Sequence, residues 1–292
     1  MYNFVKHNTY ISIMIVVPLI LCEGFATYRN PKEDKGMAEN RTMFRLQLST
    51  QASKLLSETE EKYGKSVREE EVKDLDGFEQ SEIDKDGTPV IRINPSKGRT
   101  ESTIVHELFH LKLRSEGWPN IGYLFTAGDN TDSNIQFLRW IDANLYDAIL
   151  HWLFYPQMST MEVNPNAEEK AQFEQSLRAD KYEGLNPATE REALTLYYLK
   201  AHLEVNDRQL LVQITDWYKR KEWFQPLRIG EVLIQLVKEA NPRTPEDSIS
   251  VFLKCINFLL QGTARFAPDK WMNLTFGPIT QRVAVIRVLP PN

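Results

Sequence analysis

Two histidines four residues apart, His106 and His110, constrain the fold of this chain more than any other feature. A spacing of four places both imidazoles on one face of an α-helix, about one turn apart, where they can bind the same ion. Their neighbours Ile104 and Leu108 are apolar, so this helix is expected to be buried. A glutamate buried between two histidines, as Glu107 is, would be costly without a metal. The pattern therefore predicts a zinc-binding helix.

Glu107 has a task of its own in this pattern, because it lies beside the metal rather than on it. Zinc lowers the pKa of a bound water to about 7. A carboxylate held next to that water can take its proton and later pass it to a leaving amine. The spacing therefore predicts Glu107 as the general base of a peptide hydrolysis. The alternative is a core helix whose two histidines simply have hydrogen-bond partners, since the bare motif also occurs by accident.

A catalytic zinc needs a third protein ligand and one open position. No histidine follows His110 at short spacing, so the ligand is expected on the next predicted helix, residues 132–154. Asp147 is the first choice for the metal, with His151 as the group that binds the reacting carbonyl oxygen or orients its neighbours. Three alternatives stay open: His151 on the metal, Asp142 on the metal, or Asp147 and His151 as an ordinary i,i+4 pair at a solvated edge.

The segments before the metal-type helix predict a small mixed core. Residues 43–63 carry apolar side chains at helical spacing and favour an amphipathic helix. Asp86-Gly87 between two β-prone runs predicts a hairpin with strands at 78–83 and 89–93. The second of these strands is interpreted as edge-like, a position from which it could pair with an extended substrate.

The rest of the chain is predicted to be mainly helical. Thr100 caps the metal-type helix, which runs to about Ser115. A loop is expected at 121–130, followed by the long helix at 132–154, which Pro156 should stop. The remaining expected elements are five helices and one closing strand, at 171–178, 190–205, 207–221, 229–239, 245–260 and 283–288.

This order of elements indicates an α+β fold. We expect a small zincin-like core at residues 41–160, built from a β-hairpin or sheet plus the active-site helix. A mostly helical C-terminal domain would follow at residues 161–292. With 292 residues and 42% hydrophobic content, the chain is long enough to bury a full core.

Charge and cysteine content narrow the classes of function. A formal net charge of -5 argues against a general affinity for nucleic acid. The chain has 2 cysteines, Cys22 and Cys255. If Cys22 is removed with the N-terminal segment, no intrachain disulfide can form. Cys255 lies in an apolar pattern and is interpreted as a small buried hydrophobe.

The N-terminus resembles a targeting segment. An apolar run from Tyr10 to Cys22 is too short for a spanning helix and is interpreted as part of a signal peptide, residues 1–26, with a linker at 27–40. That interpretation predicts a secreted or periplasmic protein. The alternatives are a retained membrane anchor, a lipoprotein modified at Cys22, and translation from Met37, which would leave the protein in the cytoplasm.

Residues 46–156 resemble the ImmA/IrrE-type zinc metallopeptidases, a compact branch of the zincins. The resemblance rests on the segments 89–94, 103–110 and 142–145. It implies a zincin-like fold and an acidic third ligand, commonly Glu, from the later helix, which favours Asp142. The chain departs from the family in having Asp rather than Glu at position 142, and His151 on the same helix has no counterpart in the family. The family is usually cytoplasmic, in contrast to the signal-like start.

The leading functional prediction is therefore a zinc metallopeptidase that acts on a peptide or protein. A second hypothesis is a non-catalytic interaction protein that keeps the zincin scaffold and binds a partner through its helical half. A third is a metal-dependent hydrolase of some other substrate. An N-terminal segment that is not removed would associate the protein with a membrane.

Overall fold

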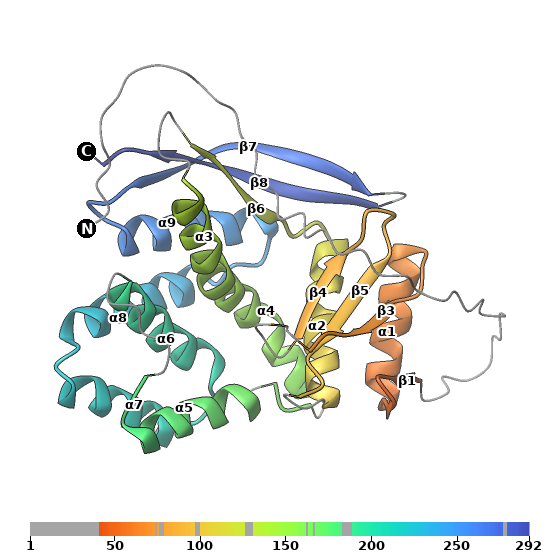
Figure 1. Cartoon of the computed structure of the whole chain (residues 1–292), viewed down its shortest axis with the longest axis horizontal. Coiled ribbons are helices and arrows are strands. Elements are labelled where there is room, and N and C mark those ends of the chain that lie inside the picture. The colour runs from red at the N-terminus through yellow and green to blue at the C-terminus, as the bar shows by residue number, and fades with distance from the viewer. Residues whose placement is uncertain are drawn as a thin grey trace. The chain divides into compact units, whose positions relative to one another are not determined.

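The computed structural model confirms the α+β class (Figure 1). It describes residues 41–73, 75, 79–96, 100–125, 131–161, 163–165, 167–182, 189–276 and 279–291. The predicted signal segment and linker lie outside these residues. None of the helices in the described ranges combines the length and apolar character needed to cross a bilayer.

The chain divides into two compact units. The N-terminal unit ends at Glu116 and includes Asn273–Gln281, and the helical unit comprises Gly117–Met272 and the residues from Arg282 onward. This division falls earlier in the chain than the expected domain border at residue 160. The zincin-like domain itself stays a prediction.

The N-terminal unit consists of short strands and two helices. Its elements are β1 Thr42–Met43, β2 Leu46–Gln47, α1 Thr50–Tyr63, β3 Arg68–Glu71, β4 Glu79–Ile83, β5 Pro89–Ile93 and α2 Glu101–Ser115. Helix α1 begins later than predicted, because Phe44 and Arg45 adopt positive φ angles between two paired strands. Ser49 caps its first turn, and Gly64 ends it in the left-handed conformation with φ 63°.

The predicted hairpin is confirmed, but its second strand is not an edge. β4 and β5 pair antiparallel, from Glu79 opposite Ile93 to Ile83 opposite Pro89. β3 pairs parallel to the other side of β5, which gives the order β3-β5-β4. The prediction that β5 could pair with an extended substrate is therefore wrong, because both of its hydrogen-bonding sides are occupied by neighbouring strands.

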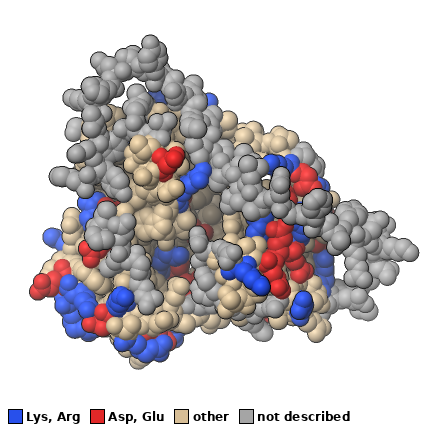
Figure 2. Space-filling view, in the orientation of Figure 1, with Lys and Arg blue, Asp and Glu red and all other residues tan. Residues whose placement is uncertain are grey.

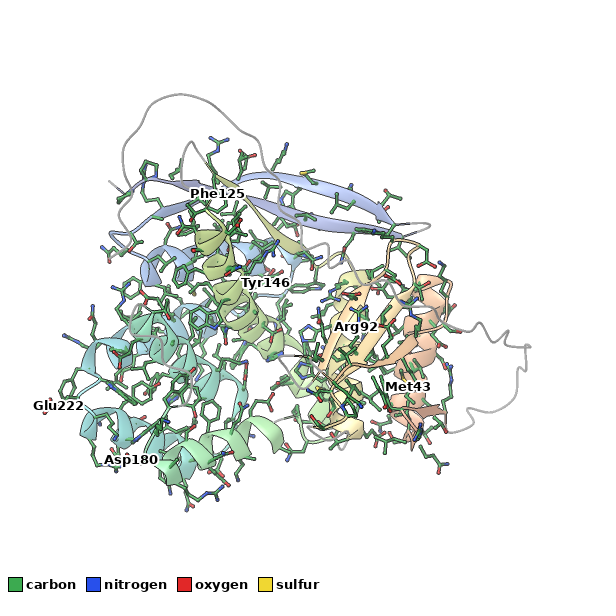
Figure 3. The ribbon with its side chains drawn as sticks, in the orientation of Figure 1. Met43, Arg92, Phe125, Tyr146, Asp180 and Glu222 are labelled. Carbon is green, nitrogen blue, oxygen red and sulfur yellow. The ribbon has the colours of Figure 1, made fainter. Side chains whose placement is uncertain are left out.

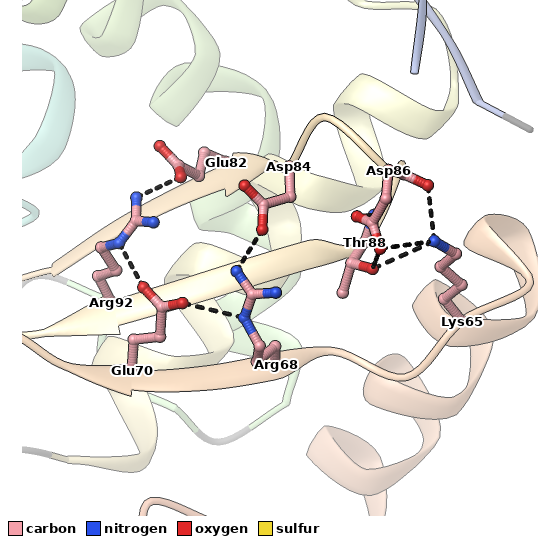
Figure 4. A network of polar contacts seen from close by, with 8 residues as sticks. All are labelled: Lys65, Arg68, Glu70, Glu82, Asp84, Asp86, Thr88 and Arg92. Atoms are coloured by element: carbon pink, nitrogen blue, oxygen red, sulfur yellow. Dashed lines mark hydrogen bonds and ion pairs between the residues drawn. The ribbon is translucent and has the colours of Figure 1, made fainter. Parts of the chain in front are cut away.

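An ion-pair network lies across this sheet (Figure 4). Arg92 on β5 is 7% exposed and donates to Glu70 on β3 at 2.7 Å, and it also pairs with Glu82 on β4. Arg68 pairs with Glu70 and Asp84. These contacts tie together all three strands of the sheet on which α2 packs.

We expect Arg92→Ala to lower the free energy of unfolding by about 2–3 kcal/mol, because it removes the cation that pairs with Glu82 and leaves Glu70 paired with Arg68 alone. Lys65→Ala is the control, since Lys65 pairs with the mostly exposed Asp86, and it should cost less than about 1 kcal/mol. Urea unfolding of both variants checks this. Equal losses would show that the network does not stabilise the sheet.

The helical unit contains seven α-helices over the described ranges, together with strand β6 and most of β7 and β8. The elements are β6 Asn120–Phe125, α3 Asp132–Ile141, a π-helical turn at Asp142–Tyr146, α4 Asp147–Thr160, α5 Ala167–Ala179, α6 Glu190–Glu204, α7 Arg208–Arg220, α8 Phe224–Ala240, α9 Pro245–Leu259, β7 Arg265–Phe276 and β8 Ile279–Leu289. If α3, the π-helical turn and α4 are counted as one helix run at 132–160, the helices predicted for this unit are confirmed. Helix α8 begins earlier in the chain than predicted.

Two predictions about strands are wrong. The segment expected as a loop at 121–130 begins with strand β6, which pairs parallel to β8 from Asn120 opposite Val283 to Phe125 opposite Val288. The two strands approach closely at Gly122, where an added Cβ would lie 3.1 Å from Val283. The closing strand is also not single, because β7 flanks β8 on its other side.

Pro156 does not stop the long helix, which continues to Thr160. An internal proline costs a helix about 3 kcal/mol. Here Phe154, Tyr155 and Met158 are all buried on the same segment, so packing on both sides of the proline offsets that cost. Tyr146, labelled in Figure 3, lies in the middle of the same helix run.

The core of the helical unit includes a group of aromatic residues. Trp217 and Tyr218 are fully buried, and Asp180, labelled in Figure 3, accepts a hydrogen bond from the Trp217 indole at 2.9 Å. Cys255 is buried as expected, and burial raises its pKa to about 12. On the surface, basic and acidic side chains of α5 and α7 lie beside one another (Figure 2), as in the pair of Lys170 with Asp207 at 2.6 Å.

Candidate metal centre

Helix α2 is held firmly in the N-terminal unit. The Thr100 side chain accepts a hydrogen bond from the backbone of Thr103, as predicted for its N-cap. The Tyr63 hydroxyl on α1 donates to the carbonyl of Leu111 at 2.8 Å, and burial raises the pKa of Tyr63 to about 12. Arg114 donates to the carbonyl of Ser81 on β4 at 2.6 Å. Hydrogen bonds therefore hold helix α2 to both α1 and β4.

The structure brings His106 and His110 together on this helix. Their Nε2 atoms lie 3.1 Å apart, and the side chains are 7% and 8% exposed. A tetrahedral zinc ion with Zn–N bonds of about 2.0–2.1 Å separates two of its nitrogens by about 3.3 Å. The pair therefore fits a zinc ion without rearrangement of the helix. Glu107, between them in sequence, is 5% exposed.

His151 on α4 is a third buried histidine that offers a ring nitrogen to a metal. It is 2% exposed, and its Nδ1 lies 2.8 Å from Oε1 of Glu204 on α6. Its Nε2 lies 3.2 Å from Oδ2 of Asp147, one turn earlier. Burial opposes protonation of His151, but the carboxylates of Asp147 and Glu204 outweigh it, so the pKa of His151 lies above its ordinary value. The predicted partners Asp147 and His151 thus lie together.

Glu204 is a residue of this site that sequence reasoning missed. Its side chain is fully buried, with a side-chain exposure of 0%. An ionised carboxylate accepts hydrogen bonds only, so the His151 nitrogen facing it must carry the proton. The other ring nitrogen, Nε2, lies toward Asp147 and is the one that could bind a metal after losing its proton. The sequence feature that could have pointed to Glu204 is its position as an acidic residue between the apolar Leu203 and Val205.

Asp142 is placed differently from the other two candidates on this helix run. Its carboxylate accepts a hydrogen bond from the Tyr123 hydroxyl on β6. Burial raises the pKa of Asp142 well above its usual range. Asp142 begins the π-helical turn that ends directly before Asp147. Such turns inside α-helices frequently occur at functional sites, and this one begins at Asp142 and ends directly before Asp147, the first choice made from the sequence.

Comparisons with known proteins found no matching family model, no matching curated protein and no matching solved structure. The resemblance to the ImmA/IrrE-type metallopeptidases therefore stays a prediction.

Proposed function

We propose that the protein is a zinc-dependent metallopeptidase in which His106 and His110 hold one zinc ion and a residue of the helix run at 132–160 completes its protein ligands. The observation that carries the proposal is the pair of buried imidazoles on α2, whose Nε2 atoms are separated by 3.1 Å. Two imidazoles at this distance can share one divalent cation, each through the lone pair of its Nε2 atom.

His151 is preferred to Asp147 as the third ligand, which reverses the first choice made from the sequence. Histidines that bind a metal almost always donate their other ring N–H to a carboxylate, which fixes the tautomer. His151 has such a partner in Glu204, at 2.8 Å. Asp147 is more exposed, at 30% of its side chain, and lies beside His151 Nε2. We assign it to the rim of the site.

Glu107 is the general base in this proposal. When bound, zinc would supply a positive charge that polarises the scissile carbonyl and makes a water more acidic. Glu107 takes one proton from the attacking water as the water oxygen bonds to the carbonyl carbon. The carbon–nitrogen bond then breaks, and Glu107 passes its proton to the leaving nitrogen. The products are a carboxylic acid and an amine, so the atoms balance.

The choice of third ligand is tested with His151→Ala and Asp147→Ala. We expect His151→Ala to weaken zinc binding by at least about 100-fold and Glu204→Gln by about 10- to 100-fold. Asp147→Ala should change zinc affinity by less than about tenfold, since it removes only a neighbouring charge. Zinc affinity is measured by competition with a coloured chelator. If Asp147→Ala weakened zinc binding more than His151→Ala did, Asp147 would be the third ligand instead.

The alternative of a non-catalytic interaction protein makes a different prediction about the same sample. Purified protein without zinc, or with zinc held by four protein ligands, would favour it, because a catalytic site keeps one position open. Zinc with three protein ligands, together with cleavage of peptides, supports the peptidase.

A further inference from the structure

Strand β7 contains the sequence Asn273-Leu274-Thr275, which matches the acceptor motif for N-linked glycosylation. The motif needs an asparagine and a Ser or Thr two positions later, with any residue except proline between them. A glycan is bulky and solvated, so a usable acceptor must also lie on the surface of the folded protein.

The strand presents both ends of the motif to solvent. Asn273 and Thr275 are exposed, whereas the residues that alternate with them are only partly exposed, namely Met272, Leu274 and Phe276. Successive side chains of a strand point to opposite faces, so residues two apart share a face. The alternation therefore places the amide of Asn273 and the hydroxyl of Thr275 together on the exposed face of β7.

The position of β7 in its sheet leaves room for a large group. β7 is an outer strand in the order β6-β8-β7, so one of its sides has no neighbouring strand among the described residues (Figure 1). Outer strands present N–H and C=O groups with which another chain could pair. A solvated oligosaccharide attached to this strand would hinder such pairing.

Trp271, two positions before the acceptor asparagine, offers a surface for the first sugar. It is 40% exposed, although large apolar side chains with this much exposure are few in the described part of the chain. Arg282 on β8 lies over its ring, with the guanidinium carbon 4.1 Å from the ring centroid. Trp271 and Asn273 share a face of the strand and lie about 6–7 Å apart along it. A sugar ring bonded to the Asn273 amide can therefore reach the exposed part of the indole and pack on it.

We propose that Asn273 carries an N-linked oligosaccharide whose first sugar packs on Trp271. The co-reactant is a lipid-linked diphosphate oligosaccharide. The bond between the anomeric carbon of the first sugar and the diphosphate oxygen breaks, and that carbon bonds to the amide nitrogen of Asn273. The nitrogen loses one proton and the lipid diphosphate leaves, so no oxidant or reductant is needed.

This inference goes beyond the proposed peptidase function and does not depend on zinc. It does depend on entry into a secretory compartment, which is what the signal peptide predicted at residues 1–26 would provide.

The test expresses the full chain, with its own N-terminus, in insect cells. Mass spectrometry of peptides from the secreted protein should find a glycan at Asn273, and enzymatic removal of the glycan should leave aspartate there. Peptide mapping separates this site from the other acceptor motif of the chain, whose asparagine, Asn40, lies outside the described residues.

Asn273→Gln and Thr275→Ala should abolish the modification at this site, whereas Thr275→Ser should retain it. Asn206→Gln is the control, because Asn206 is exposed but is not part of an acceptor motif, and it should leave the glycan in place. Secreted protein without a glycan at Asn273, retention of the whole chain inside the cell, or a glycan that persists in Thr275→Ala would overturn the inference.

Trp271→Ala tests the contact with the first sugar. The variant should still be glycosylated, because Trp271 is not part of the acceptor motif. Removal of the glycan should lower the melting temperature of the wild type by about 2–4 °C, and that of Trp271→Ala by less than about 1 °C. Equal decreases in the two proteins would contradict the packing of the sugar on Trp271.

Discussion

Replacement of Glu107 by Gln should leave zinc content unchanged and reduce kcat/KM for peptide hydrolysis by about 10²- to 10⁴-fold. The amide keeps the size and burial of the side chain, which is 5% exposed, but it cannot take a proton from water. Cleavage is measured on a mixed peptide library by mass spectrometry, alongside metal analysis of the same sample.

The matched control for this prediction is Glu116→Gln, an exposed glutamate just past the end of α2. It changes the same charge without touching the buried face, so activity should stay within about twofold, as for most surface substitutions. If the Glu107→Gln protein cleaved peptides at the wild-type rate, Glu107 would not be the general base.

Replacement of His106 by Ala should lower zinc affinity by at least about 100-fold, because it removes one of the three proposed ligands, a buried imidazole on α2. A metal that binds the folded chain in preference to the unfolded chain raises the melting temperature, so zinc should raise that of the wild type. That increase should vanish in His106→Ala. Differential scanning calorimetry with and without chelator measures it.

His202→Ala is the control for a half-buried histidine outside the proposed site. His202 packs on the ring of Tyr198 at 4.3 Å between centroids, and burial lowers its pKa to about 4. Its replacement should cost some stability but leave zinc affinity unchanged. Should His106→Ala keep zinc while His202→Ala loses it, the assignment of the metal centre to α2 would be wrong.

The parts of the fold that the sequence predicted are those that depend on local signals. The turn at Asp86-Gly87 needs a positive φ, and Gly87 has φ 85°. The Thr100 cap and the four-residue histidine spacing are likewise set within one helix. Such features follow from residues close in the chain, so a sequence suffices to place them.

The parts that were missed depend on distant segments. Strand β6 pairs with β8, which lies about 160 residues later in the chain, as Asn120 opposite Val283 shows. No local sequence pattern predicts that parallel pairing. Pro156 stays helical only because of the packing around it. The role of Glu204 depends on the contact between α4 and α6, which is a tertiary property. For the same reason the choice between Asp147 and His151 could not be made from spacing.

The most direct test of the account is X-ray absorption at the zinc edge, on the wild type and on His151→Ala. The wild type should show three imidazole ligands with Zn–N distances of about 2.0–2.1 Å and one further oxygen. His151→Ala, reloaded at high zinc concentration, should show two imidazoles. A wild-type spectrum with only two imidazoles, or one that His151→Ala leaves unchanged, would contradict the three-histidine centre.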